Sequence, residues 1–151
     1  MKKQLVTLAL ILVTGFTGLF ANNSDAVSAN VRSAFEKEFA NAKNISWKIS
    51  KEFSKATFTV NDQVLFAYYS EGGQLLAVSR NLLSAQLPIN LSVDLKKSYA
   101  GFWISDLFEM AANGESTYYA TVENADHKYI LKSSGMRGWT IFKKEKKDSE
   151  Q

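Results

Sequence analysis

The sequence predicts an α+β protein built as a tandem repeat, in which each half packs one helix on four antiparallel strands. Three observations support this fold class. One apolar stripe with i, i+4, i+8 spacing, typical of a helix face, consists of Val31, Phe35 and Phe39. A stripe with the same spacing follows sixty residues later and consists of Leu91, Leu95 and Tyr99. Runs of alternating apolar and polar residues come after each stripe and favour strands.

The first half should contain a helix followed by four strands. Ser28 or Asn30 can cap the free N–H groups of the first turn, and the helix is expected to continue to about Lys43. The strands are expected at residues 45–49, 56–60, 64–69 and 75–79. Asn61 and Asp62 tolerate the positive φ angles of a tight hairpin, so they should join the second strand to the third.

The second half should repeat this order. Pro88 suits the first turn of a helix, because the N–H that it lacks would be unpaired there. The helix is expected to continue to about Tyr99 and to end at Gly101. The strands are expected at residues 104–111, 117–123, 128–133 and 139–143. Asn113 and Gly114 should form the first hairpin turn of this half.

Residues 1–21 have the anatomy of a signal peptide. Lys2 and Lys3 form a positive n-region, an apolar stretch ends near Phe20, and Ala21 offers a small residue for cleavage. The apolar stretch is shorter than the about 20 residues of a membrane anchor. We therefore expect cleavage after Ala21, periplasmic or secreted residence and no stable membrane anchor afterwards. Residues 22–29 should be a flexible lead-in, and residues 145–151 a charged tail.

The composition of the chain excludes several kinds of partner and of reactive site. The leader removes two of the 18 basic residues and none of the 15 acidic ones, which leaves a net charge of +1. Since no basic stripe is visible for phosphate binding, nucleic acid is not an expected partner. The chain has no cysteine, which excludes disulfides, a thiol nucleophile, a cysteine zinc site and a lipid-anchored cysteine.

Three segments carry a family resemblance. They are Asn-Ala-Lys-Asn-Ile-Ser-Trp at residues 41–47, Ser-Glu-Gly-Gly-Gln-Leu-Leu at residues 70–76, and the helix opening Leu-Pro at residues 87–88. On the basis of these three segments, residues 30–144 resemble the PepSY-like, beta-lactamase-inhibitor-like secreted proteins of Bacteroidetes. The resemblance implies two units, at about residues 30–81 and 87–144, that form one curved antiparallel sheet with both helices on one face. It also implies periplasmic or secreted residence and no established catalysis.

No catalytic, metal or cofactor site is expected. His127 is the only histidine, and with its neighbour Asp126 it falls short of the about three protein ligands of a zinc site. It is also the only side chain that could act as a base at neutral pH for a serine nucleophile, and the Gly-x-Ser-x-Gly motif is absent. Spacing alone does not exclude a carboxylate pair, but nearly all the acidic residues considered fall at turns or strand ends: Asp62, Glu71, Glu115, Glu123 and Asp126.

A binding surface is expected on the helix-free side of the sheet. If Phe58 faces the helix, then Phe66 and its alternate neighbours should pair with it on the same side. The residues left on the other side would form an apolar-aromatic face for a partner, made of Leu65, Tyr69, Tyr119 and Ile130. A strand register shifted by one residue would invert this assignment.

Three functions remain open from the residues. The first is a non-enzymatic, inhibitor-like exported module that binds another envelope or secreted protein through the helix-free face. The second is a carrier of a small ligand or cell-wall fragment in a pocket between the repeats. The third and weakest is a carboxylate-dependent glycan hydrolase. A binding module predicts a flat aromatic face, a carrier predicts an enclosed apolar pocket, and a hydrolase predicts two facing carboxylates in a cleft.

Overall fold

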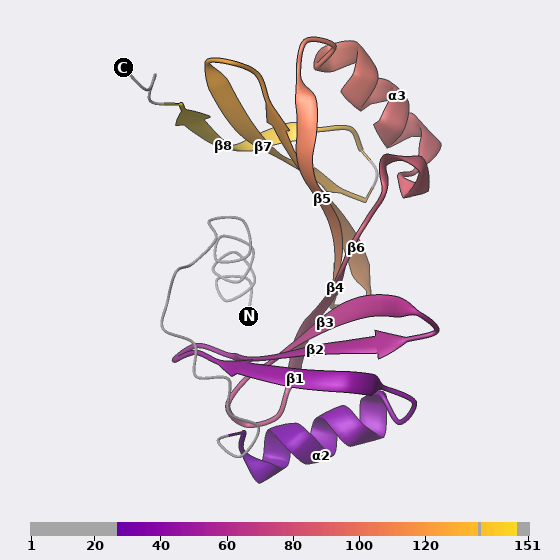
Figure 1. The fold of residues 1–151 in the computed structure, drawn as a ribbon, viewed down its shortest axis with the longest axis vertical. Helices are drawn as coiled ribbons and strands as arrows, with labels where there is room; N and C mark the ends of the chain where they lie inside the picture. Colours follow the sequence, from indigo (N-terminus) through magenta and orange to yellow (C-terminus); the bar gives the residue numbers. More distant parts are fainter. Residues whose placement is uncertain (1–26, 136, 148–151) are drawn as a thin grey trace. The chain divides into compact units, whose positions relative to one another are not determined.

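The computed structural model describes residues 27–135 and 137–147. Within them, eight antiparallel strands are hydrogen-bonded in sequence order from β1 to β8, and two α-helices accompany them (Figure 1). The predicted α+β class with an antiparallel sheet is confirmed. The chain divides into two compact units after Ser79. The predicted signal peptide and residues 22–26 of the predicted lead-in lie outside the described residues.

The first unit contains one helix and the strands that precede the division. Its elements are α2 (Ala29–Glu38), β1 (Lys43–Ile49), β2 (Ser54–Val60), β3 (Gln63–Tyr69) and β4 (Leu75–Asn81), which continues past the division. The Ser28 hydroxyl caps α2 by accepting from the Val31 N–H at 3.3 Å. The helix ends at Glu38, before the predicted Lys43, because the chain turns after the C-cap residue Phe39 and the Ala42 N–H donates to the Phe39 carbonyl.

The hairpin between β2 and β3 decides which side chains face α2. Asn61 and Asp62 have φ angles of 49° and 62°, as a two-residue turn of the type favoured in hairpins requires. This turn pairs Val60 with Gln63 and Phe58 with Leu65. The prediction that Phe66 shares a face with Phe58 is therefore wrong by one residue.

The core of the first unit is aromatic. Phe35 of α2 lies at its centre, and its ring contacts those of Trp47 at 5.2 Å and Phe58 at 4.9 Å, both edge-on. Val31 is buried one turn earlier on the same helix face. Val27 is buried in this core as well, so the end of the predicted lead-in belongs to the folded unit.

The second unit has the same kinds of element. They are α3 (Ile89–Ser98), β5 (Trp103–Ala112), β6 (Glu115–Glu123), β7 (His127–Ser134) and β8 (Thr140–Lys146), preceded by a short 3-10 helix, Ser84–Gln86. β8 continues two residues into the predicted tail. Trp139 ties the start of β8 to α3, because its indole N–H donates to the Leu91 carbonyl at 2.9 Å and its backbone N–H donates to Asp94 at 3.1 Å.

The core of the second unit is aliphatic where the first is aromatic. Leu95 of α3 packs with Leu107, Ala120, Val122 and Leu131 from three neighbouring strands. Ala120 and Val122 of β6 therefore face the helix. Asn113 and Gly114 form the predicted two-residue turn, with φ angles of 53° and 76°.

Candidate functional site

Two of the four residues predicted for the partner-binding face lie instead in the first core. Leu65 packs against the cluster beneath α2, and Tyr69 is fully buried in it. The Tyr69 ring lies 6.4 Å from that of Phe35 and 6.3 Å from that of Trp47. The prediction that Leu65 and Tyr69 point away from the helix is wrong, because the two-residue turn pairs odd positions of β3 with even positions of β2.

The Tyr69 hydroxyl is buried without a hydrogen-bond partner among the described residues. Burial, with a smaller contribution from the carboxylate of Glu38, raises the pKa of Tyr69 to about 12. The unpaired hydroxyl therefore destabilises the folded state.

We expect Tyr69→Phe to increase the free energy of unfolding by about 1 kcal/mol, because the variant removes a buried polar group that has no partner. Tyr68→Phe is the matched control, since the Tyr68 hydroxyl lies 3.5 Å from that of Ser79. That change should leave stability equal or slightly lower. Urea denaturation of both variants measures the difference, and a destabilised Tyr69→Phe contradicts the prediction.

The other two predicted residues do lie on the side of the second unit that faces away from α3. Tyr119 and Ile130 alternate with the core residues Ala120 and Leu131, so they point to the opposite side of the sheet. Both are buried, with 3% and 1% of their surface exposed. Burial raises the pKa of Tyr119 to about 12.

Neighbouring side chains cover the Tyr119 ring. The ring stacks on that of Phe108 at 4.9 Å and meets that of Phe142 edge-on at 5.9 Å. The Lys132 ammonium lies 5.9 Å from the centres of both the Tyr119 and Phe142 rings. Phe142 and Lys132 are half-buried. They are therefore more accessible to a partner than Tyr119 itself.

The first unit has a comparable group on its helix-free side, which sequence reasoning missed. The Lys55 ammonium lies 4.2 Å from the Phe66 ring centre and 5.6 Å from the Tyr68 ring centre. Burial, and secondarily the charge of Lys48, lowers the pKa of Lys55. We call these two groups, Lys55 with Phe66 and Tyr68, and Lys132 with Tyr119 and Phe142, the lysine–aromatic clusters. The pairing that a two-residue turn imposes on β2 and β3 places Lys55, Phe66 and Tyr68 on one face, so the sequence contains the signal for the first cluster.

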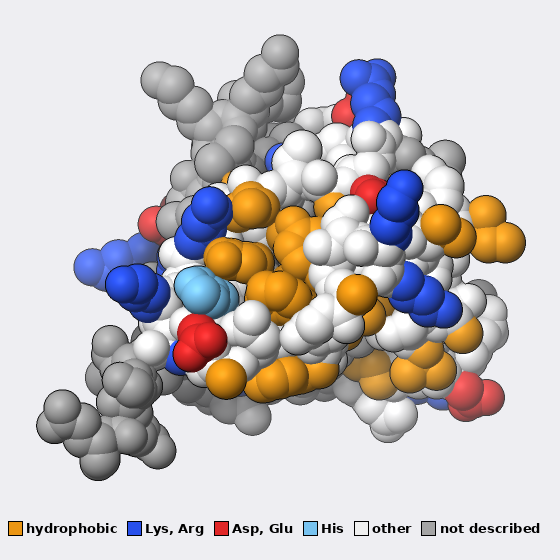
Figure 2. Space-filling model, turned by 90° about the horizontal axis from the view of Figure 1, so that it is seen from above, with side chains coloured by type: hydrophobic (Ala, Val, Ile, Leu, Met, Phe, Trp, Pro, Cys, Tyr) orange, Lys and Arg blue, Asp and Glu red, His pale blue; other side chains and the backbone are white. Residues whose placement is uncertain are grey.

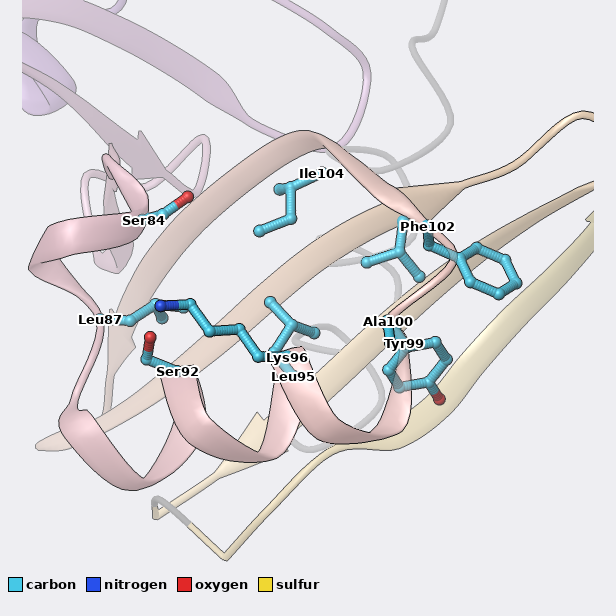
Figure 3. A pocket seen from close by; sticks show the side chains of 10 residues that line it. Ser84, Leu87, Ser92, Leu95, Lys96, Tyr99, Ala100, Phe102 and Ile104 are labelled. Atoms are coloured by element: carbon cyan, nitrogen blue, oxygen red, sulfur yellow. The ribbon is translucent and has the colours of Figure 1, made fainter.

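A cavity of about 240 Å³ opens between α3 and the sheet of the second unit (Figure 3). We call it the α3 pocket. The Lys96 side chain extends along it toward Leu87, and Tyr99 and Phe102 lie at the other end. Its apolar lining consists of Leu87, Leu95, Tyr99, Ala100, Phe102, Ile104 and Val122.

An aromatic group adjoins the α3 pocket. The Phe102 ring lies 5.7 Å from that of Tyr99 and 5.4 Å from that of Tyr129, and His127 stacks on Tyr129 at 5.7 Å. Figure 2 shows apolar side chains gathered beside this histidine, drawn in pale blue. Burial raises the pKa of Tyr99, and the charges of Asp94 and Tyr129 add to the effect.

Two polar side chains with possible catalytic roles, His127 and Glu123, are engaged in other contacts. His127 stacks on an aromatic ring, and no group of three potential metal ligands occurs in residues 27–135 and 137–147. Glu123 pairs with Lys147 at 2.7 Å. Hydrogen bonds from Lys147 and Ser105 lower the pKa of Glu123 and so hold it in its charged form. A general acid would need the opposite shift.

Comparisons with known proteins show the fold. No protein-family model and no curated protein matches the chain. A DUF2874 family protein from Bacteroides ovatus has a TM-score of 0.71, 19% sequence identity, and coverage of 82% of this chain and 89% of its own. A BLIP-like protein from Bacteroides fragilis has a TM-score of 0.68 and 17% identity over 82% of this chain and 89% of its own. The chain therefore has a BLIP-like fold, which confirms that part of the predicted resemblance.

A third solved structure has a similar fold. It is described as a candidate periplasmic protein from Bacteroides eggerthii, with a TM-score of 0.69 and 12% identity over 80% of this chain and 88% of its own. Among the helices that the structure describes, none has the length and apolar character to span a membrane.

Proposed function

We propose that this protein is an exported, non-enzymatic, inhibitor-like module that binds another envelope or secreted protein. Its proposed contact surface is the helix-free side of each unit, where the lysine–aromatic clusters lie. Cleavage of the leader after Ala21, the PepSY-like relationship and the tandem repeat with both helices on one face belong to this proposal. The observation that carries it is the ammonium group placed over two aromatic rings in each unit.

Such clusters suit recognition because their side chains are ordered before a partner arrives. Phe66 and Phe142 are half-buried, and each is held by a lysine. Ordered aromatic side chains lose little conformational entropy on binding and bury a large apolar area. Aromatic residues are also enriched among the residues that dominate binding energies.

The two alternative functions receive less support. The α3 pocket lies within the second unit and, at about 240 Å³, is smaller than the roughly 300–1,000 Å³ of typical small-molecule sites, so it does not support a carrier of cell-wall fragments. The hydrolase would need a carboxylic acid with a raised pKa beside a second carboxylate. Glu123, one of the acidic residues considered, has a lowered pKa and an ion pair instead.

Site-specific photo-crosslinking tests the proposed function. A photoreactive phenylalanine analogue replaces Phe66 or Phe142 in the full chain expressed in a Bacteroides host, and Lys37 on the exposed side of α2 serves as the control position. We expect both cluster positions to crosslink the same exported protein, and the control position not to. A Lys132→Ala change should weaken the crosslink from position 142. Absence of a common partner, or equal crosslinking from position 37, contradicts the proposal.

A further inference from the structure

We propose that the α3 pocket binds one bulky apolar side chain from an acidic segment of a partner protein. This site lies on the opposite side of the second unit's sheet from the lysine–aromatic cluster. The inference rests on the proposed function only in taking the occupant to be a protein.

The size and lining of the pocket indicate a single side chain. An apolar cavity of about 150 Å³ holds a benzene-sized molecule, so about 240 Å³ accommodates one aromatic or branched aliphatic group. Leu87, Leu95 and Val122 supply a buried apolar lining, whereas Ile104 is 37% exposed. Polar atoms come from only a few lining side chains, which are Ser84, Ser92, Lys96 and Tyr99.

The outer side of α3 continues this apolar surface. Ile89 and Val93 are 84% and 61% exposed and lie one turn apart. By helical geometry they are next to Ser92 and Lys96, which line the pocket. Neither residue contributes to the core of its unit, so folding does not account for their apolar character. An exposed apolar group beside an open pocket is typical of an interaction site.

The first unit provides an internal comparison. Sixty positions earlier, α2 has Ala29 where α3 has Ile89, Ser33 where α3 has Val93, and Glu36 where α3 has Lys96. The positions that point into the two cores stay apolar in both helices, whereas these outer positions differ in polarity and charge. The apolar residues Ile89 and Val93 and the basic residue Lys96 are therefore specific to α3, whereas Lys97 has a counterpart in Lys37 of α2.

Charge selects the kind of partner. Lys96 lines the pocket, Lys97 follows it in the last turn of α3, and the Lys144 ammonium lies 5.9 Å from the Tyr129 ring. The carboxylate of α3, on Asp94, is engaged by Trp139 and Ser98. Carboxylates of a partner would therefore be attracted to the lysine side chains at the rim of the α3 pocket.

The same cations disfavour a second copy of this chain as the occupant. A symmetric dimer with its two-fold axis near the end of α3 would bring the pair Lys96 and Lys97 toward the same pair on the other copy. Like charges facing each other across an interface repel. An acidic segment of a different protein fits the surface better.

Methyl NMR of the full chain without its leader tests the proposal. The probe is a synthetic peptide with one central leucine between two pairs of glutamates. Two matched peptides replace the glutamates by lysines, or the leucine by serine. We expect saturable shifts of the Leu87, Leu95, Ile104 and Val122 methyl signals with the first peptide. Each matched peptide should bind at least about tenfold more weakly.

Two variants of the protein sharpen the test. Lys96→Glu should weaken binding of the acidic peptide about tenfold, and Lys37→Glu, the same charge reversal on the exposed side of α2, should not. Unchanged pocket methyl signals, or equal shifts with the lysine peptide, overturn the proposal. Self-association that Ile89→Ser abolishes also overturns it. Crosslinking from position 142 is independent of this site. If that crosslink forms while the α3 pocket binds no peptide, only the α3 proposal is rejected and the proposed function stands.

Discussion

Phe35→Ala is expected to lower the free energy of unfolding of the first unit by about 3–5 kcal/mol, and Leu95→Ala that of the second by about 2–5 kcal/mol. Phe35 is 2% exposed, and its ring contacts four other aromatic rings. Leu95 is 3% exposed and lies in the aliphatic core beneath α3. Each truncation removes apolar surface from its core and leaves a cavity.

Urea denaturation monitored by far-UV circular dichroism measures these losses. Each variant reports on its own unit, so two transitions would separate the effects if the units unfold independently. Ser33→Ala and Lys97→Ala, on the exposed sides of the two helices, are the controls and should change stability by less than about 0.5 kcal/mol. If Phe35→Ala or Leu95→Ala leaves the free energy of unfolding nearly unchanged, the assigned helix faces are wrong.

The elements of this fold could be predicted from local signals. The Asn113-Gly114 turn and the alternating runs are short-range patterns that the structure places as expected. The first two residues of each apolar stripe are buried on a helix, and the third is the C-cap residue. Helix ends were less accurate: α2 ends at Glu38 because the chain turns after Phe39, which no residue type announces.

The faces of the strands were predicted in one unit and missed in the other. Tyr119 and Ile130 point away from α3 as expected, whereas Leu65 and Tyr69 point toward α2. The difference comes from the parity of a two-residue turn, in which the residues that flank the loop share a face. The sequence identifies Asn61 and Asp62 as the turn, so it also contains the information that assigns the correct face.

The α3 pocket could not be derived in the same way. Its volume depends on how far α3 covers the sheet and on the packing of Phe102 and Ile104, which are tertiary properties. One signal was present, because Ile89 and Val93 are apolar and lie outside the helix stripe. Exposed apolar residues that adjoin one another, as these two do beside the pocket, are more informative than single ones, because contiguous apolar patches mark interaction sites.

Alkaline unfolding is expected to begin above about pH 10, because three of the six tyrosines are buried. Burial raises the pKa values of Tyr68, Tyr69 and Tyr119 from 10.0 to about 12. As the pH rises, the unfolded chain therefore loses these protons before the folded chain does. The stability that the three groups contribute is fully present below about pH 10 and is lost as the pH rises through about 12.

The expected size of this effect is large. A pKa difference of about 2 corresponds to roughly 2–3 kcal/mol for each tyrosine. Lys55 acts in the opposite direction, because its pKa is lowered from 10.5 and stability rises with pH between its folded and unfolded values. Because one lysine opposes three tyrosines, the net free energy of unfolding should fall as the pH rises above about 10.

Tyrosinate absorbance and circular dichroism, recorded on the same pH titration, measure this prediction. We expect the buried tyrosines to ionise together with the loss of secondary structure, in one cooperative step. Tyr119→Phe removes one of the three groups and should move the midpoint of unfolding to higher pH. Complete ionisation of all six tyrosines while the secondary structure is retained would show that these rings are open to solvent in the folded protein.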